Sequence, residues 1–241
     1  MKPNKNFRYF LTVSMLAICA SVYADETTVV NSTKDAAAAP GTPPCKHCKE
    51  AALQTTTPLN FEPFTEWFAA NQRTELDCLK VGFTDQDGRK GQLSDFRGRP
   101  MVISFFYSRC ENRLKCPATV AKFGELQQSL QSAGLNKSVT QLMISFEPQY
   151  DTPGRLNSYA KSHGMKCNDD CRMLQLDEKS MSQVIKNLDV PVNYNSGWVN
   201  IHGVVLYLVD DTGRLVRKYH TLLWDNQAVV ADVTKLLKEE K

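Results

Sequence analysis

The stretch Met101-Val-Ile-Ser-Phe-Phe-Tyr-Ser-Arg-Cys110 decides the fold of this chain. Residues 101–108 are almost continuously apolar, which is typical of a strand buried on both faces of a sheet. The segment from Pro117 to about Ala133 has a helical pattern, and proline suits the first turn of a helix. In α/β folds, chemistry gathers where a central strand ends and the next helix begins. The sequence therefore places a candidate site between Ser108 and Pro117.

The flanking segments continue the alternation of strands and helices. We expect strands at 80–84, 90–93, 139–146, 172–176, 204–209 and 214–219, and helices at 152–163, 179–188 and 226–238. Phe61, Phe64, Trp67 and Phe68 have helical spacing, so residues 60–71 are predicted to form a short amphipathic helix. The order of elements predicts an α/β fold with a central mixed β-sheet flanked by helices.

Length and charge narrow the classes of protein. The chain has 241 residues, 42% of them hydrophobic, which suits one domain together with a leader and a tail. Lys+Arg total 29 against 26 for Asp+Glu, and these charges are spread along the chain. Nucleic-acid binding needs basic residues clustered on one face, so we expect no nucleic-acid partner.

The first 24 residues have the pattern of an export signal peptide. Lys2, Lys5 and Arg8 precede an apolar run at 9–20, and small residues stand at the cleavage position before Asp25. The run is shorter than a membrane-spanning helix needs, so cleavage is expected and membrane tethering requires an uncleaved leader. We expect a periplasmic protein in which a flexible tail rich in Ala, Thr and Pro covers 25–59 and one domain covers 60–241.

The cysteines fall into close pairs. The chain has eight, and cleavage of the leader removes Cys19. Cys45 and Cys48 form a C-x2-C pair in the tail, which suits either a disulfide without further role or an auxiliary metal or redox pair. Cys167 and Cys171 flank short polar residues, and there we favour a structural disulfide at a turn. The remaining single cysteine, Cys78, is predicted to be a small buried hydrophobic residue.

Cys110 and Cys116 occupy the candidate site. The positive end of a helix favours the thiolate form of a nearby cysteine, and Arg109, Arg113 and Lys115 act in the same direction. Thiolates attack disulfides and bind soft metals, so the pair suits a copper(I) site or a thiol–disulfide site. A structural bridge is the alternative.

A wider set of segments resembles the Sco/SenC family of thioredoxin-like copper chaperones over about 76–238. The set comprises Leu93-Ser-Asp-Phe-Arg-Gly-Arg-Pro100, Phe105-Phe-Tyr-Ser108 with the two cysteines, Ile144-Ser-Phe-Glu-Pro-Gln-Tyr-Asp-Thr-Pro153 and Asn200-Ile-His202. The resemblance implies a thioredoxin-like fold, with Cys110 and Cys116 as thiolate ligands and His202 as the third ligand. Two thiolates and an imidazole suit copper(I).

The resemblance also implies a function. It indicates a metallochaperone that delivers copper to cytochrome c oxidase or assists its assembly. The client is then a copper-receiving or thiol-bearing protein, with cytochrome c oxidase subunit II as a candidate. Without the two cysteines, His202 is more simply interpreted as a core residue.

The spacing between the cysteines departs from the family pattern. The family has three residues between them, and this chain has five, Glu111 to Lys115. On a continuous helix, six positions rotate the second side chain by about 240° from the first. Cys110 is therefore predicted to lie in the loop before the helix and Cys116 in its first turn.

Two other classes of function are weighed against the chaperone. A periplasmic thiol–disulfide oxidoreductase needs Cys110 and Cys116 but not His202, and it is the enzyme class this chain fits best. Such reductases have a cis-proline facing the cysteines, where this chain has Ile201-His202-Gly203. A peroxiredoxin is disfavoured because the residues before Cys110 lack the pattern that positions peroxide. The last class is a binding module without copper or redox chemistry. If the chain is such a module, its function does not depend on Cys110, Cys116 or His202.

Overall fold

The computed structural model describes residues 65–222 and 224–239. The predicted leader at 1–24 and tail at 25–59, with Cys19, Cys45 and Cys48, lie outside them. In chain order the strands and helices are β1 (Thr65–Trp67), β2 (Gly82–Asp85), β3 (Lys90–Gln92), β4 (Met101–Phe106), α1 (Cys116–Ser132), β5 (Thr140–Ser145), α2 (Pro153–Ser162), β6 (Cys171–Leu176), α3 (Glu178–Leu188), β7 (Val192–Asn195), β8 (Trp198–His202), β9 (Leu206–Val209), β10 (Leu215–Tyr219) and α4 (Asn226–Glu239).

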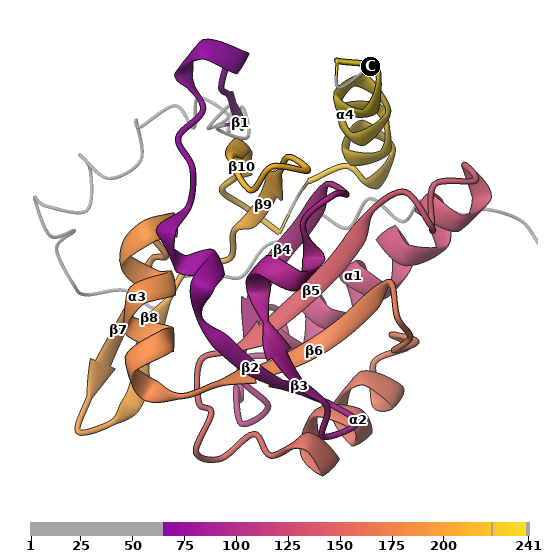
Figure 1. Ribbon diagram of the computed structural model, residues 1–241. Coiled ribbons are helices and arrows are strands. Elements are labelled where there is room, and N and C mark those ends of the chain that lie inside the picture. The colour runs from indigo at the N-terminus through magenta and orange to yellow at the C-terminus, as the bar shows by residue number, and fades with distance from the viewer. Residues whose placement is uncertain (1–64, 223, 240–241) are drawn as a thin grey trace, which may run out of the picture. The chain divides into compact units, whose positions relative to one another are not determined.

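Eight strands form one mixed sheet in the order β1-β10-β9-β4-β5-β6-β2-β3 (Figure 1). β4, β5 and β6 are parallel, and the other neighbours pair antiparallel. Parallel strands end at the same edge of a sheet, and β9, which runs antiparallel to β4, begins at that edge. The loops after β4 and β5 and the segment before β9 therefore meet at one edge.

β4 is the central strand because its side chains are buried on both faces. Val102 and Phe106 pack into one hydrophobic cluster, and Ile103 and Phe105 pack into another on the opposite face. All six residues of the strand are buried. This arrangement explains why the sequence there lacks the alternation of a half-exposed strand.

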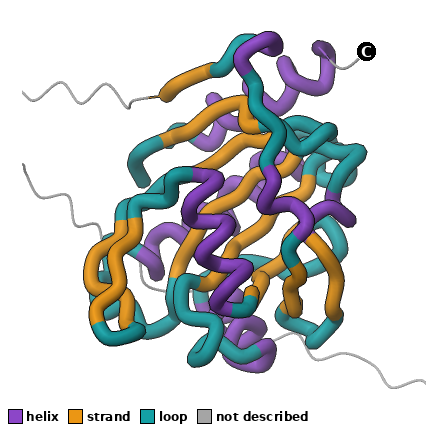
Figure 2. Tube along the Cα trace, turned by 60° about the vertical axis from the view of Figure 1, so that its left-hand side comes forward, coloured by secondary structure: helices purple, strands orange, loops and turns teal. Residues whose placement is uncertain are grey.

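Helices cover both faces of the sheet (Figure 2). One cluster unites the strands with Val120 and Phe123 of α1, Leu156 of α2 and Val233 of α4. The other includes Val184 of α3 and the two short 3₁₀ helices Asp77–Lys80 and Leu93–Phe96. The predicted α/β class, with a central mixed sheet flanked by helices, is confirmed.

The structure corrects the prediction for residues 60–71. Thr65–Trp67 form strand β1 on β10, and Ala70–Gln72 form a short 3₁₀ helix, whereas one amphipathic helix was expected. Trp67 pairs with Arg217 of β10, so the backbone of this segment is hydrogen-bonded at the edge of the sheet. The Nζ atom of Lys235 lies 3.8 Å from the Trp67 ring centroid. Edge-strand pairing therefore prevails over local helical spacing, which is a weak signal in so short a segment.

The β7–β8 hairpin was not predicted. It forms a separate two-stranded sheet beside α3 (Figure 1). Its turn has positive φ at Ser196 (50°) and Gly197 (82°), the backbone of a tight hairpin turn. A register shift between Asn193 and Tyr194 breaks the alternation of apolar and polar residues, so the sequence shows no clear strand signal.

Two cysteine predictions have different outcomes. Cys78 is 1% exposed, and its burial raises the pKa of its thiol to about 12, so the prediction of a buried hydrophobic residue is confirmed. Cys167 and Cys171 are free thiols, which differs from the predicted disulfide. Asn168 and Cys171 pair across a tight antiparallel turn that directs Cys171 into the core and leaves Cys167 half-buried. None of the described helices has the length and apolar character needed to cross a membrane.

Candidate metal centre

Cys110, Cys116 and His202 meet at the edge of the sheet where β4 ends. The Nε2 atom of His202 lies 3.8 Å from the Sγ atom of Cys110 and 3.5 Å from that of Cys116. One ligand atom from each residue lies within 4.8 Å of the others. Within 65–222 and 224–239, this is the one group of three His, Cys, Asp or Glu residues close enough to hold a metal ion.

A turn in the loop brings the two cysteines together despite the long spacing. Cys116 is the first residue of α1, and Cys110 lies in the preceding loop, as predicted. The carbonyl O of Asn112 accepts from the Lys115 N–H at 3.0 Å, and its Oδ1 accepts from the Leu114 N–H at 2.9 Å. This turn, closed by the carbonyl and side chain of one asparagine, takes up the two extra residues.

The backbone fixes the ring of His202. His202 is the last residue of β8, and its Nδ1 atom lies 3.0 Å from the carbonyl O of Gly203. The carbonyl can only accept, so Nδ1 carries the proton and the lone pair of Nε2 faces the two sulfur atoms. The Tyr107 ring, which is nearly perpendicular to the imidazole, and the Phe146 ring both pack on it, with centroids 5.4 and 5.5 Å away.

The centre is buried, and burial governs its protonation. Cys110 is 9% exposed, Cys116 0% and His202 5%. Burial raises the pKa of the Cys116 thiol far above its ordinary value, and the charge of Cys110 adds to this, while a hydrogen bond from the Tyr107 backbone opposes it. Burial lowers the pKa of His202, keeping the imidazole neutral at neutral pH. The expectation that the helix end and basic residues favour a free thiolate is therefore wrong for Cys116, because desolvation is the larger effect.

Arg109 has a different role from the predicted one. Its Nε and Nη2 atoms both donate to Oε2 of Glu147, at 2.9 and 2.8 Å, so its charge is paired within the protein. The other oxygen of Glu147, Oε1, accepts from the N–H of Val199 at 3.3 Å. Arg109 precedes Cys110 and Val199 lies on the strand that ends at His202. The ion pair therefore joins the cysteine loop to the histidine hairpin.

Aromatic rings complete this connection. The guanidinium carbon of Arg109 lies 3.7 Å from the ring centroid of Trp198 and 4.2 Å from that of Tyr150. Cations are attracted to aromatic faces, most strongly where water is excluded. We call Arg109, Glu147, Val199, Trp198 and Tyr150 the Arg109 clamp. The sequence analysis gave no role to Glu147, Trp198 or Tyr150. Glu147 and Tyr150 follow β5 within the family-like stretch 144–153, whereas nothing in the sequence singled out Trp198.

Ser108 and Ser145 hold the ends of the two central strands together. Both hydroxyls donate to the carboxylate of Asp151, which is fully buried, and the Ser108 N–H donates to the same carboxylate at 3.2 Å. The loops that follow β4 and β5, which bear Cys110 and Glu147, therefore start from a fixed point.

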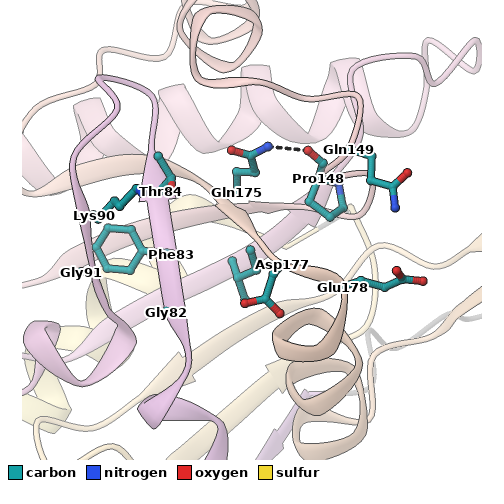
Figure 3. Close-up of a pocket in the computed structure, with 11 residues that line it drawn as sticks. Gly82, Phe83, Thr84, Lys90, Gly91, Pro148, Gln149, Gln175, Asp177 and Glu178 are labelled. Atoms are coloured by element: carbon teal, nitrogen blue, oxygen red, sulfur yellow. Dashed lines mark hydrogen bonds between the residues drawn. The ribbon is translucent and has the colours of Figure 1, made fainter.

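The centre opens into a hollow of about 450 Å³ lined by Tyr107, Glu111, Lys115, Asn200 and the ligands Cys110 and His202, among others. A larger pocket of about 560 Å³ lies over β2, β3 and the start of α3 (Figure 3). Its lining includes Lys90, Gln175, Asp177 and Glu178 but no cysteine or histidine. The soft ligands that copper(I) prefers are found only in the first of these two hollows.

Comparisons with known proteins match this chain to one family. Residues 80–238 match the family model described as SCO1/SenC. No curated protein sequence matches the chain. A SCO1/SenC family lipoprotein from Bacillus anthracis str. Ames is 23% identical, covering 70% of this chain and 99% of its own, with a TM-score of 0.61.

Two further solved structures are similar. BsSco, described as a member of the Sco family of cytochrome c oxidase assembly proteins with a disulfide switch, is 23% identical (68% of this chain, 94% of its own, TM-score 0.59). Bradyrhizobium japonicum ScoI, solved with copper bound, is 24% identical (65% of this chain, 96% of its own, TM-score 0.53). At these identities the structures establish the fold, which confirms the predicted thioredoxin-like class.

Proposed function

Because this chain belongs to the SCO1/SenC family, we propose that it is a copper(I)-binding metallochaperone of the Sco type. Copper is its cargo, held by the Sγ atoms of Cys110 and Cys116 and by Nε2 of His202. The observation that carries the proposal is the convergence of these three atoms within 4.8 Å. Similar proteins have been solved with copper bound, from Bradyrhizobium japonicum, Arabidopsis thaliana and yeast.

The chemistry of the site supports this cargo. Two sulfur donors and one neutral imidazole form a soft set of few ligands, which suits copper(I). The hydrogen bond from His202 to Gly203 fixes the tautomer that leaves Nε2 free to bind. Copper binding displaces the thiol protons, and the neutral imidazole contributes no proton to be lost.

The client and the location extend the proposal. The protein delivers copper to cytochrome c oxidase or assists its assembly, with subunit II as the receiving protein. Residues 1–24 act as the export signal, 25–59 as a tail, and 60–241 as the thioredoxin-like domain, which works in the periplasm. The description of one similar protein as a lipoprotein and of another as an oxidase assembly protein supports this placement.

Thiol–disulfide exchange by Cys110 and Cys116 is the second candidate function. The contact of both sulfur atoms with one nitrogen favours it, because the two thiols are then neighbours. The raised pKa of the Cys116 thiol counts against it, because thiolate is the attacking form. His202 separates the two functions, since exchange does not require it.

Anaerobic copper(I) titration against a competing chelator tests the proposal. The full chain is used in a Cys45→Ser/Cys48→Ser background, which removes the tail thiols. We expect one tightly bound copper, lost in Cys110→Ser/Cys116→Ser and weakened at least about tenfold in His202→Ala. His163→Ala is the matched control, because His163 packs on the Tyr159 ring and is not part of the Cys110, Cys116 and His202 group; it is expected to keep full affinity. Equal affinity in the His202→Ala protein contradicts the three-ligand site.

A further inference from the structure

Exposed apolar side chains gather around the candidate metal centre. Among residues 65–222 and 224–239, the large hydrophobic residues that are exposed are Leu114 (80%), Ile201 (65%), Trp198 (53%) and Tyr194 (38%). Leu114 lies in the loop between the two cysteines, and the other three lie on the hairpin that ends at His202. Exposed apolar residues that are grouped together often mark an interaction site, whereas single exposed apolar residues are common on any protein surface.

The loop and the hairpin form one surface. Lys115, next to Leu114, donates from Nζ to the carbonyl O of His202 at 3.1 Å, which joins the two segments. Tyr194 uses its hydroxyl within the protein, donating to the carbonyl O of Phe146 at 3.0 Å. Leu114, Trp198 and Ile201 remain open to a partner, and we call these three residues the apolar rim.

The basic side chains next to the apolar rim have no carboxylate partner among the described residues. Arg113 and Lys115 flank Leu114, and no carboxylate in the described part of the chain lies within ion-pair distance of either. Glu111 is the one acid of the same loop, and Glu147 is paired with Arg109. Residues 192–202 of the hairpin contain no Lys, Arg, Asp or Glu. The surface next to the centre is thus apolar with a small excess of positive charge.

The buried ligands restrict how copper leaves. Cys116 is fully buried and Cys110 and His202 nearly so, which excludes direct release to a distant acceptor. Transfer requires an acceptor whose own ligands enter the hollow beside Cys110 and His202. Such an acceptor covers the apolar rim while its ligands reach the metal.

We propose that the apolar rim, with Arg113 beside it, is the docking face for the protein that exchanges copper with this centre. The matching face of that partner is apolar in the middle and acidic at its edge. This inference rests on the copper function proposed above. Leu114 and Ile201 supply apolar area that desolvates the exchange, and Arg113 steers an acidic partner toward it.

A second copy of this chain and a lipid surface fit less well. Two copies meeting at this face bring together two surfaces with the same small excess of positive charge, and like charges repel. A bilayer pressed onto the rim covers the opening of the hollow, through which an acceptor has to enter. An acidic protein partner meets both conditions.

Transfer kinetics test the docking face. The copper-loaded full chain is mixed anaerobically with the metal-free soluble domain of cytochrome c oxidase subunit II, and separately with the small chelator bathocuproine disulfonate. We expect Leu114→Ser/Ile201→Ser to slow transfer to the protein about tenfold, with copper affinity and transfer to the chelator unchanged. Arg113→Glu slows protein transfer several-fold at low salt, and this difference shrinks as salt is added.

Lys238→Glu is the matched charge control. Lys238 precedes Glu239, which pairs with Arg73. The Nη1 atom of Arg73 also lies 3.8 Å from Oδ2 of Asp210. Asp210 follows Val209, the last residue of β9, which pairs with Met101 at the start of β4. Lys238→Glu therefore makes the same change of charge as Arg113→Glu, but at the end of the sheet opposite to the metal centre. We expect this variant to transfer copper at the same rate as the parent.

Three other results of the transfer experiment overturn the docking face. Equal transfer to the subunit II domain by the parent and by Leu114→Ser/Ile201→Ser, at equal copper affinity, overturns the docking face and leaves the copper function standing. Loss of vesicle binding or of dimers in that variant, without slower transfer, assigns the rim to lipid or to a second copy and also overturns it. No transfer from the parent, while the chelator still removes copper, contradicts delivery to this client and the docking proposal with it.

Discussion

At the residue scale, Arg109 positions the loop that bears Cys110 instead of acting mainly on the acidity of the neighbouring thiol. Its guanidinium is paired with Glu147 and held between the rings of Trp198 and Tyr150. The Glu147 side chain is 5% exposed, so its carboxylate depends on this partner. In a buried ion pair of this kind the attraction roughly offsets the cost of removing both charges from water, but removing one partner is costly.

Replacing Arg109 is therefore expected to be more damaging than replacing Glu147. Arg109→Met leaves a buried carboxylate without its cation and lowers the free energy of unfolding by about 2 kcal/mol, less than for a fully buried pair because Arg109 is partly exposed. Glu147→Gln leaves the Arg109 cation unpaired, but this charge is partly exposed to water, so the change costs less. Both variants also weaken copper(I) binding, because the histidine hairpin is no longer held to the cysteine loop. Urea unfolding and copper titration measure the two effects.

Arg155→Met is the control for the stacking alone. Arg155 also lies on the Tyr150 ring, 4.0 Å from its centroid, but does not contact Glu147 or the hairpin. It is expected to leave copper affinity unchanged. Copper affinity that stays the same in Arg109→Met as well excludes a positioning role for the clamp.

At the scale of elements, the loop between the cysteines is organised by Asn112. Its side chain caps the turn through the Leu114 N–H, and its carbonyl closes the turn through the Lys115 N–H. Asn112→Ala removes the side-chain contact and is expected to weaken copper(I) binding by about fivefold, since a lost turn hydrogen bond contributes about 1 kcal/mol. Asn112→Asp keeps an acceptor oxygen and restores most of the affinity. Equal affinity in the alanine variant shows that the turn forms without this side chain.

Helix α3 provides a prediction about acid stability. Asp177 caps it, accepting from the Ser180 N–H at 2.8 Å, and this hydrogen bond with that from the Ser180 hydroxyl lowers the pKa of the carboxyl. A lowered native pKa means that the unfolded chain binds the proton more readily. The charged cap thus stabilises the fold above the unfolded pKa of about 3.9, and this contribution is lost as pH falls through the lower native value.

Replacing Asp177 separates the cap from its charge. Asp177→Ala is expected to cost about 1 kcal/mol of unfolding free energy at pH 7. Asp177→Asn keeps a capping oxygen and costs less at pH 7, with a difference from the parent that narrows toward pH 3. Denaturant unfolding across this range measures both effects. A difference between Asp177→Asn and the parent that is constant with pH contradicts the role of the charge.

At the scale of the whole molecule, most of the fold was predictable because long elements carry strong patterns. The apolar run of β4 and the helical segments of α1 and α4 each bury a continuous face, so hydrophobic periodicity alone identifies them. β1 and the β7–β8 hairpin were missed because β1 exists through its pairing with β10 and the hairpin is interrupted by a register shift. Such structure depends on contacts that local sequence does not reveal.

The candidate site was predicted less completely than the fold. The boundary between a buried strand and the next helix identified Cys110 and Cys116, and the family resemblance added His202; the structure brings the three together. The raised pKa of the Cys116 thiol was not foreseen, because it depends on burial by distant residues. The clamp was also missed, because Arg109, Glu147 and Trp198 come from three separate segments and the sequence does not show that their side chains meet.

X-ray absorption spectroscopy of the copper(I)-loaded protein tests the central claim most directly. The full chain carrying Cys45→Ser/Cys48→Ser is loaded with one equivalent of copper under anaerobic conditions. Coordination by Cys110, Cys116 and His202 predicts two sulfur neighbours and one imidazole nitrogen per copper, with the nitrogen signal lost in His202→Ala. A spectrum with sulfur neighbours alone, unchanged by His202→Ala, contradicts the three-ligand site.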